Sequence, residues 1–322
     1  MADPRADVAS RLADSLRTQG VEAEVEVVAR ATVGLSQETW LATVAIEGAS
    51  REVVLRLPTP MSGSRSILTQ RAALQAVAGQ ALPVPELLWF DDGSENGFGR
   101  PFIVMERAPG TVPVGWHELP EPERTALAAQ AIDVLADLHA IDVSATSLGG
   151  AKGSPLMDVD RLRALFDRLA PVPPVVTAAF WWLDRHRPRS PEHRTIVHGD
   201  YRMGNMVVDR GRITGILDWE MAAPGDPLLD LVWCFIPVWV PSLVDEEPLF
   251  RRYAERTGVT LEPDRVHWHR VFGLLRLAYY TLSGTRAFDA GATDDLRLAA
   301  VRLQLPVNLD RVAAAIAGDT VV

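Results

Sequence analysis

The chain has 322 residues, of which 48% are hydrophobic and 23% are charged, values close to those of soluble globular proteins. At roughly 100–200 residues per domain, this length predicts one large or two ordinary domains. The formal net charge of −10 argues against a general nucleic-acid binder or a protein held on anionic lipid, because both partners are themselves negative.

The first hundred residues predict a small β-rich part of the molecule. Apolar residues with helical spacing come first, and runs of β-branched residues separated by glycine-containing turns follow. Short apolar runs with tight turns between them are typical of an antiparallel meander. The predicted elements are a helix over 4–19, strands within 21–33, 40–46 and 53–57, a helix over 64–80 and a strand over 102–105.

Helices dominate the rest of the sequence, with one exception. Between residues 194 and 220 the pattern returns to β, with two short strands joined by a turn at 209–212. The predicted helices cover 119–140, 157–170, 174–187, 226–237, 246–257, 264–284 and 293–316. Two domains are therefore expected, 1–106 and 107–322, joined by a linker near 106–112. A cleft between two such parts is a favoured ligand site.

No segment predicts export or membrane insertion. The longest uncharged run, 231–244, contains two prolines and is shorter than the roughly 20 apolar residues of a membrane-spanning helix. The N-terminal residues show no apolar stretch before a small-residue cleavage site, so we expect a cytoplasmic protein. The single cysteine, Cys234, excludes an internal disulfide, and its apolar neighbours predict a buried packing residue.

The segment from 196 to 230 carries the groups best suited to chemistry. Asp200 follows a short apolar run, which predicts a loop acid at the end of a buried strand, and Asn205 comes five residues later. A hairpin then returns the chain to Asp218. Because a hairpin folds back on itself, Asn205 and Asp218 can face each other at one sheet edge. A carboxylate and an amide oxygen suit Mg²⁺, which keeps waters and binds substrate phosphates, and Asp200 is left as a candidate base.

The pattern H-G-D-x-x-x-x-N followed by I-L-D resembles the catalytic and metal-binding motifs of the aminoglycoside phosphotransferase and choline kinase family, relatives of the protein kinases. The longer form HGDYRMGN…ILDWEMAAPGDPLLDL is most similar to the kinase-like domains related to acyl-CoA dehydrogenases. The resemblance covers about Val33 to Asp230. It implies a kinase-like, two-lobed α+β fold, with a small N-terminal antiparallel sheet lobe and a larger helical C-terminal lobe.

The resemblance also implies a reaction and its residues. The γ-phosphate of ATP would move to a hydroxyl of a small molecule with the help of Mg²⁺. Asp200 would orient that hydroxyl and accept its proton, while Asn205 and Asp218 would hold the metal. Arg202, at a position where many protein kinases have a lysine, would stabilise charge on the transferred phosphoryl group. We expect a monomer or a homodimer.

The upstream motifs match with two departures from the kinase pattern. Gly34 and Ser36 lie in the turn that would cover the nucleotide phosphates. Arg56 replaces the strand lysine that contacts the phosphates, and its guanidinium fork suits this role. Gln70 stands where the partner glutamate of that cation is usual, and an Arg–Gln contact is weaker than an ion pair.

The segment 102–108 resembles the hinge that receives the adenine base in kinases. The backbone groups of Glu106 and Ala108 would make this contact. Since main-chain atoms are used, the side chains at these positions say little about it.

Three polar residues near the motif are expected to be structural. His198 would brace the loop that carries Asp200. Asp226 and Asp230 lie at the start of a helix predicted over 228–235, where acidic side chains cap free backbone N–H groups.

The acceptor is left open by the sequence. An aminoglycoside, another natural product and a hydroxyacyl-CoA are all compatible, and Arg270, Arg276 and Arg286 are candidate contacts for the last. Lys152 is the only lysine, so phosphate contacts fall to arginines. The alternative function is a catalytically weak nucleotide-binding pseudokinase or a scaffold protein, which Gln70 would favour.

Overall fold

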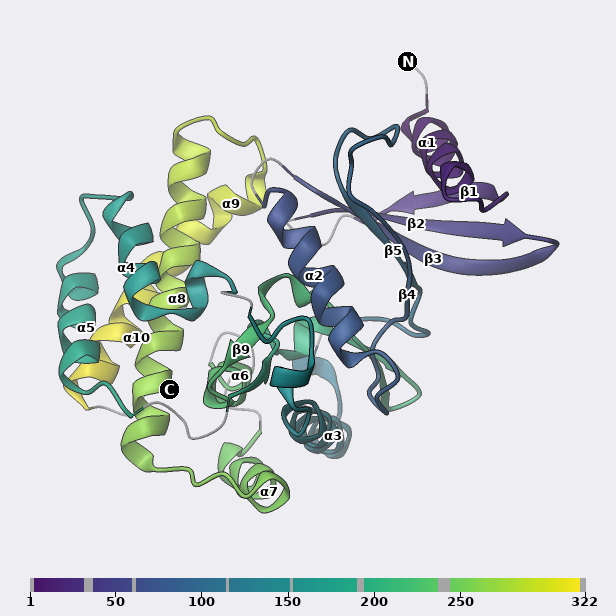
Figure 1. Ribbon diagram of the computed structural model, residues 1–322. Helices are drawn as coiled ribbons and strands as arrows, with labels where there is room; N and C mark the ends of the chain where they lie inside the picture. The colour runs from purple at the N-terminus through teal and green to yellow at the C-terminus, as the bar shows by residue number, and fades with distance from the viewer. Residues whose placement is uncertain are drawn as a thin grey trace. The chain divides into compact units, whose positions relative to one another are not determined.

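The computed structural model describes residues 3–31, 37–59, 62–113, 116–150, 153–189, 194–236 and 244–318 (Figure 1). The chain forms two compact units. The first unit comprises Met1–Val112, Ser144–Ala151 and Asn205–Ala222, and the second comprises Pro113–Val143, Lys152–Gly204 and Ala223–Val322. The division into a nucleotide-binding lobe over 1–106 and a catalytic lobe over 107–322 stays a prediction.

A five-stranded antiparallel sheet with the order β1-β2-β3-β5-β4 is the framework of the first unit, as predicted. Alternate residues of β2 and β3 are buried, and they pack against the apolar face of α1. The elements are α1 (Pro4–Thr18), β1 (Glu24–Arg30), β2 (Gln37–Ile46), β3 (Ala49–Pro58), α2 (Ser64–Val77), β4 (Leu87–Asp91) and β5 (Phe102–Glu106). The sequence pattern missed β4, because its residues are all half-buried and show no alternation.

The predicted hairpin is also present in the first unit. It pairs β7 (Met206–Asp209) with β8 (Arg212–Ile216). Arg210 and Gly211 both have positive φ, as the tight turns that join twisted antiparallel strands require. The short helix η4 (Met203–Asn205) precedes this hairpin, and η5 (Trp219–Met221) follows it.

The second unit is mainly helical, as predicted. Its helices are α3 (Glu121–His139), α4 (Val159–Asp167), α5 (Pro174–Arg185), α6 (Leu228–Cys234), α7 (Glu246–Thr257), α8 (Pro263–Asp289), α9 (Leu296–Ala300) and α10 (Leu305–Ala317). Two short strands, β6 (Thr195–Val197) and β9 (Ala223–Gly225), pair with each other. The single helix predicted over 293–316 is wrong: α9 and the short helix η6 (Val301–Gln304) precede α10, whose first turn contains a proline that cannot donate a helix hydrogen bond.

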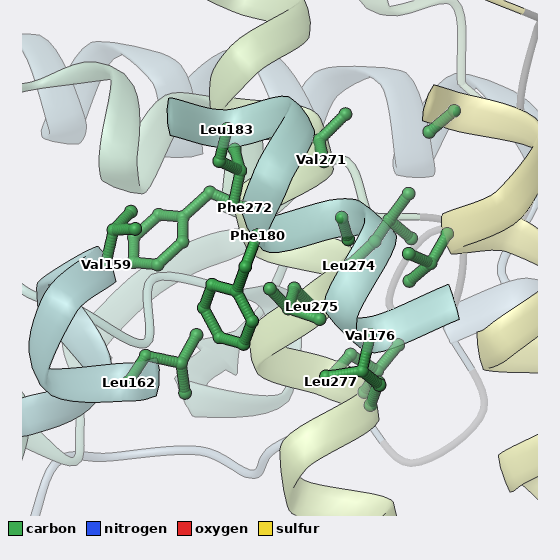
Figure 2. Close-up of a cluster of buried hydrophobic side chains, with 14 of the residues drawn as sticks. Val159, Leu162, Val176, Phe180, Leu183, Val271, Phe272, Leu274, Leu275 and Leu277 are labelled. Atoms are coloured by element: carbon green, nitrogen blue, oxygen red, sulfur yellow. The ribbon is translucent and has the colours of Figure 1, made fainter. Parts of the chain in front are cut away.

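The core of the second unit is built around α8. Side chains from α4 and α5 pack against its buried face (Figure 2). Leu274 and Leu275 of α8 are fully buried, and Phe180 of α5 contacts the ring of Phe166 edge to face at 5.6 Å. Burial at consecutive positions of α8 shows that this helix is covered by neighbours on more than one side.

Cys234 is buried at the end of α6, which confirms the predicted packing role. Burial raises the pKa of its thiol to about 12, so the thiolate is scarce at neutral pH. Among the described residues, no helix is both long and apolar enough to cross a membrane.

Removal of a core ring tests this packing. Phe180→Ala should lower the free energy of unfolding by about 3–5 kcal/mol, because it deletes a buried aromatic side chain and leaves a cavity. Trp181→Ala is the matched control. Trp181 is the next residue along the chain, its side chain is 65% exposed, and its removal should cost far less stability. Urea denaturation followed by circular dichroism measures both. Equal losses in the two variants would contradict this account of the core.

Candidate active site

Arg56, Gln70 and Asp218 form a connected polar cluster in the first unit. Nη2 of Arg56 donates to Oδ1 of Asp218 at 2.9 Å. Nη1 of Arg56 donates at 2.8 Å to the side-chain oxygen of Gln70. This holds for the amide orientation in which the Gln70 oxygen, and not its NH₂ group, faces Arg56. Gln70 is fully buried, and the Arg56 side chain is 12% exposed. Strand β3, helix α2 and the segment after β8 therefore bring these three residues together.

The backbone of Asp218 has an unusual conformation that orients its carboxylate. Its φ of 72° and ψ of 54° lie in the left-handed region, which costs a residue with a side chain roughly 1–2 kcal/mol. Hydrogen bonds on both sides hold it there. The N–H of Leu217 donates to the carbonyl of Asn205 at 2.8 Å, and the N–H of Trp219 donates to the Gln70 side chain at 3.3 Å. Strain of this kind tends to occur at functional sites.

The two predicted metal ligands are joined through the hairpin. The backbone of Asn205 bonds to Leu217, the residue before Asp218. Arg56 occupies one carboxylate oxygen of Asp218, Oδ1, and the other oxygen has no hydrogen bond among the described residues. An amide oxygen and a carboxylate oxygen fit a hard cation that keeps waters. Within the described ranges, no cluster of three or more His, Cys, Asp or Glu side chains forms a metal site.

The remaining nucleotide contacts are only partly described. Gly34, Ser36 and Lys152 lie outside the described residues. The N–H of Glu106 donates to the carbonyl of Glu86 at 2.9 Å, so this N–H is not free for a base. The N–H of Ala108 has no hydrogen-bond partner within the described part of the chain. Their contact with adenine stays a prediction.

In the second unit, Asp230 holds the backbone of the loop that carries Asp200. The Asp230 carboxylate is fully buried and accepts hydrogen bonds from the N–H groups of His198 and Gly199, at 2.6 and 2.8 Å. Nε2 of His139 lies 3.4 Å from Oδ2 of Asp230, the oxygen that also accepts from His198. Asp230 is therefore structural, as predicted, but it holds this loop and does not cap the start of α6.

Two residues from other helices complete this support. Arg276 of α8 donates to the carbonyl of Gly199, and its guanidinium lies over the ring of Trp233 at 4.1 Å. Trp233 of α6 donates its indole N–H to Oδ1 of Asp200 at 2.8 Å. Gly199 has a φ of 88°, a conformation that glycine adopts without a steric penalty. Sequence reasoning did not find the role of Trp233, because it resembles an ordinary core residue in an apolar helix.

Arg202 lies beside the candidate base. Its Nε is 3.2 Å from Oδ1 and 3.1 Å from Oδ2 of Asp200, whose side chain is 16% exposed. Gly204 leaves room for this guanidinium, because a Cβ there would collide with Nη1 of Arg202. The N–H of Asp200 donates to Nδ1 of His198 at 3.2 Å, so the predicted bracing role of His198 is confirmed.

The three arginines suggested as acceptor contacts have structural partners instead. Arg270 pairs with Glu246 at 2.6 Å, and Arg276 is buried against the loop. Arg286 donates to the carbonyls of Leu169 and Pro171. Their contact with an acceptor stays a prediction, because the sequence does not show which arginines already have partners within the fold.

Loss of the Asp230 carboxylate should destabilise the second unit. Asp230→Ala leaves two buried N–H groups without an acceptor, at about 1–3 kcal/mol each, so unfolding should become easier by several kcal/mol. Asp133→Ala is the control, since Asp133 pairs with Arg252 at the surface and such pairs contribute about 0–1 kcal/mol. Denaturant midpoints compare the two. A cost for Asp230→Ala no larger than the control's would show that the loop does not depend on it.

Comparison with solved structures identifies the fold. A structure from Ralstonia eutropha assigned to the aminoglycoside phosphotransferases aligns over 97% of this chain and 98% of its own, with a TM-score of 0.76 and 22% identity. A thermostable mutant of the aminoglycoside phosphotransferase APH(4)-Ia, solved with ADP and hygromycin B, aligns over 96% and 98% with a TM-score of 0.64 and 22% identity. The fold is therefore the kinase-like α+β fold of these enzymes.

Sequence comparison reaches the same group. The chain is 30% identical over 212 residues to mouse acyl-CoA dehydrogenase family member 10, covering 62% of this chain and 20% of that protein. It is 27% identical over 224 residues to the hygromycin-B 4-O-kinase of Escherichia coli, covering 64% and 61%. The chain thus spans about a fifth of the mouse relative. The family model described as the phosphotransferase enzyme family matches residues 27–269, so the chain belongs to this family.

Proposed function

We propose that this protein transfers the γ-phosphate of ATP to a hydroxyl group of a small molecule, with Mg²⁺. The observation that best supports the proposal is the support of the Asp200 loop. Backbone groups on both sides of Gly199 are held by Asp230 and Arg276, and the Asp200 carboxylate itself accepts from Trp233. A base held in this way orients a hydroxyl without having to be ordered during the reaction.

In this proposal Asp200 aligns the acceptor hydroxyl and takes its proton as the phosphoryl group leaves ATP. Arg202 keeps a positive charge next to that carboxylate and stabilises negative charge on the phosphoryl group. The protein forms no covalent intermediate. Positioning and electrostatic stabilisation therefore account for most of the rate enhancement.

Asn205 and Asp218 are the proposed ligands of Mg²⁺, which neutralises phosphate charge when bound. Without nucleotide, Arg56 is paired with Asp218 at 2.9 Å. Arg56 would hold the nucleotide phosphates, and Asp218 would then be left to hold the cation. Each charge keeps a counter-charge throughout. Because Gln70 is neutral, it positions Arg56 without cancelling the charge that the phosphates need.

The finer assignments follow the sequence-based predictions. We propose that residues 1–106 bind the nucleotide, with Gly34 and Ser36 over the phosphates and the backbone of Glu106 and Ala108 at the base, and that residues 107–322 bind the acceptor. The relatives named for hygromycin B support a natural-product acceptor, and those named for acyl-CoA dehydrogenases keep a hydroxyacyl-CoA in view. We further propose a cytoplasmic protein, monomeric or homodimeric, without a nucleic-acid or membrane partner.

A catalytically weak pseudokinase or scaffold is the second candidate. The Arg56–Asp218 pair favours it, since a nucleotide must break this ion pair before it binds. The two functions differ in turnover. A pseudokinase binds ATP without releasing ADP when acceptors are added, whereas a phosphotransferase releases ADP in proportion to the acceptor consumed.

Replacement of the proposed base tests the mechanism. Asp200→Asn should keep the fold and the affinity for ATP, because the amide oxygen can still accept from Trp233. Turnover should fall by about 10²–10⁴-fold, the usual contribution of a general base. ADP release with an accepted hydroxyl compound measures the rate, and ATP titration serves as the binding control. Wild-type turnover in this variant would remove Asp200 from the mechanism.

Two further variants separate metal contacts from phosphate contacts. Asp218→Ala should abolish the Mg²⁺ dependence of ATP binding, since Asn205 alone offers one neutral oxygen. Arg56→Ala should weaken ATP binding but leave adenosine binding nearly unchanged, because only the phosphates lose a partner. Calorimetric titration of both ligands measures this. Equal losses of adenosine and ATP affinity would indicate a damaged fold and contradict both roles.

A further inference from the structure

A cavity of about 430 Å³ in the second unit is lined by an unusual number of arginines. Its walls come from the start of α4, the segment after α5, the paired strands β6 and β9, and α8. The charged lining residues are Arg161, Arg187, Arg189, Arg194, Asp158 and Asp226. Such a concentration of positive charge stands out in a chain with a net charge of −10.

The two aspartates of the cavity are already engaged. Asp226 accepts from Arg265 at 2.7 Å and from His269 at 3.2 Å. Burial alone would raise the pKa of Asp226, but these contacts outweigh it and hold the pKa well below its usual range. Asp158 accepts from the backbone N–H of Arg161 at 2.9 Å, as the N-cap of α4. Both carboxylates therefore already have hydrogen-bond donors within the fold.

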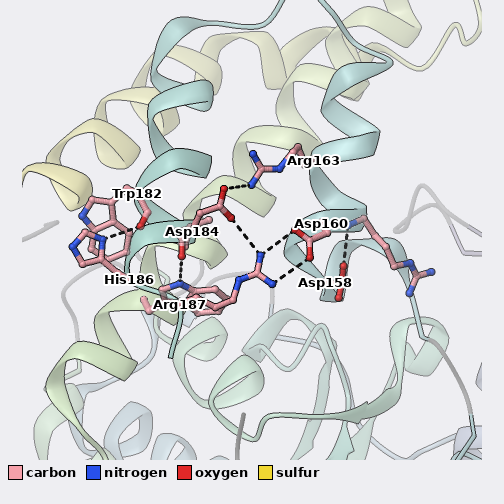
Figure 3. A network of polar contacts seen from close by, with 10 residues as sticks. Asp158, Asp160, Arg163, Trp182, Asp184, His186 and Arg187 are labelled. Atoms are coloured by element: carbon pink, nitrogen blue, oxygen red, sulfur yellow. Dashed lines mark hydrogen bonds and ion pairs between the residues drawn. The ribbon is translucent and has the colours of Figure 1, made fainter. Parts of the chain in front are cut away.

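The arginines differ in how far their charge is compensated. Arg187 is held by Asp160 and Asp184 in the network of Figure 3, at 3.0 and 3.3 Å. Arg194 donates to the carbonyl of Pro224, a neutral group that positions the guanidinium without neutralising it. Arg189 has no carboxylate partner within the described ranges. The uncompensated positive charge therefore lies on Arg189 and Arg194.

A buried orphan atom gives a second, independent indication of a ligand. His269 lines the cavity and is 5% exposed, and its Nδ1 has no hydrogen-bond partner among the described residues. Buried polar atoms almost always have a partner, so this nitrogen has a hydrogen-bonding position left for water or a ligand. Val197, Trp268 and Phe272 supply apolar lining. The cavity thus suits an organic molecule with one anionic group.

Two helices that line this cavity also carry residues that contact the Asp200 loop. Val197, a lining residue, is the last residue of β6 and precedes Asp200 in the chain by three residues. Leu229 lines the cavity four residues, or about 6 Å along the helix, before Trp233 of α6, and Phe272 of α8 is likewise four residues before Arg276. Helices α6 and α8 therefore contribute both to the lining of the cavity and to the contacts that hold the Asp200 loop.

We propose that this cavity binds the anionic group, a carboxylate or a phosphate ester, of the acceptor, so that the acceptor is an organic anion rather than a polycation. Arg189 and Arg194 supply the positive charge, and the apolar lining receives the carbon skeleton. The statement that the bound anion is the acceptor rests on the proposed phosphotransferase function. The statement that the cavity binds an anion does not depend on that function, so the two statements are tested separately.

Binding is tested with phenyl phosphate, titrated calorimetrically into the full chain. The wild type should bind it saturably, and benzyl alcohol, which has a similar ring but no charge, should not bind. The double variant Arg189→Ala/Arg194→Ala should lose affinity by about tenfold or more, since two charge-assisted hydrogen bonds are removed. The control Arg168→Ala/Arg185→Ala removes the same charge from exposed positions outside the cavity and should bind like the wild type.

Arg56→Ala separates this site from the proposed nucleotide site. It should leave phenyl phosphate binding unchanged, because Arg56 belongs to the first unit. The proposal is overturned if the wild type shows no saturable binding of phenyl phosphate, if the Arg189/Arg194 double variant binds as tightly as the wild type, or if Arg56→Ala is the change that abolishes binding.

The acceptor part is tested by ADP release with 6-hydroxyhexanoate and 6-amino-1-hexanol, which differ mainly in the sign of their charge. The carboxylate should be the better substrate, and the Arg189/Arg194 double variant should lose this preference through a higher KM. An equal or greater rate with the amino alcohol overturns the anionic acceptor while leaving the phosphotransferase intact. Absence of ADP release with every acceptor counts against the proposed function, and the phenyl phosphate titration still decides whether the cavity binds anions.

Discussion

The buried carboxylate of Asp230 is the interaction on which the candidate base depends. It accepts from two consecutive backbone N–H groups, and the loop could not stay at its buried position if these donors were unpaired. A carboxylate without donors would be equally costly there. The buried carboxylate and the two buried N–H groups therefore require each other, and their hydrogen bonds fix the path of the chain directly before Asp200. Trp233 and Arg276 then act on a loop that is already in place.

The first unit holds a cation and an anion against each other. Arg56 and Asp218 neutralise each other in the absence of ligands, and Gln70 holds the arginine with a neutral amide. A glutamate at this position, as in the kinase pattern, would form an ion pair with the guanidinium. The left-handed backbone of Asp218 adds a conformational cost that the surrounding hydrogen bonds offset.

The use of arginine for nearly every positive charge has consequences beyond the candidate site. A guanidinium stays charged when it is buried and can bond to backbone carbonyls, so the fold uses Arg276 and Arg286 as structural braces. Arg194 also donates to a backbone carbonyl, that of Pro224, and it lines the cavity of the second unit together with Arg189.

Local patterns in the sequence were enough to predict most elements and the order of the motif residues. The spacing of Asp200, Asn205 and Asp218, the hairpin between the last two, and the antiparallel sheet all follow from short-range periodicity and turn residues. The helix break before α10 was missed because helical apolar spacing continues across a proline. Strand β4 was missed because half-buried residues give no alternation.

Only the tertiary structure decided which side chains are partners. Arg56 and Asp218 are 162 residues apart, and Trp233 reaches Asp200 from a helix that looked like ordinary core. Arginine supplies all but one of the 32 lysine and arginine residues, so composition could not separate braces from free charges. Periodicity reports the environment of each residue along its own helix or strand. The geometry and charge balance of a site depend instead on contacts between distant segments, which form only when the chain is packed.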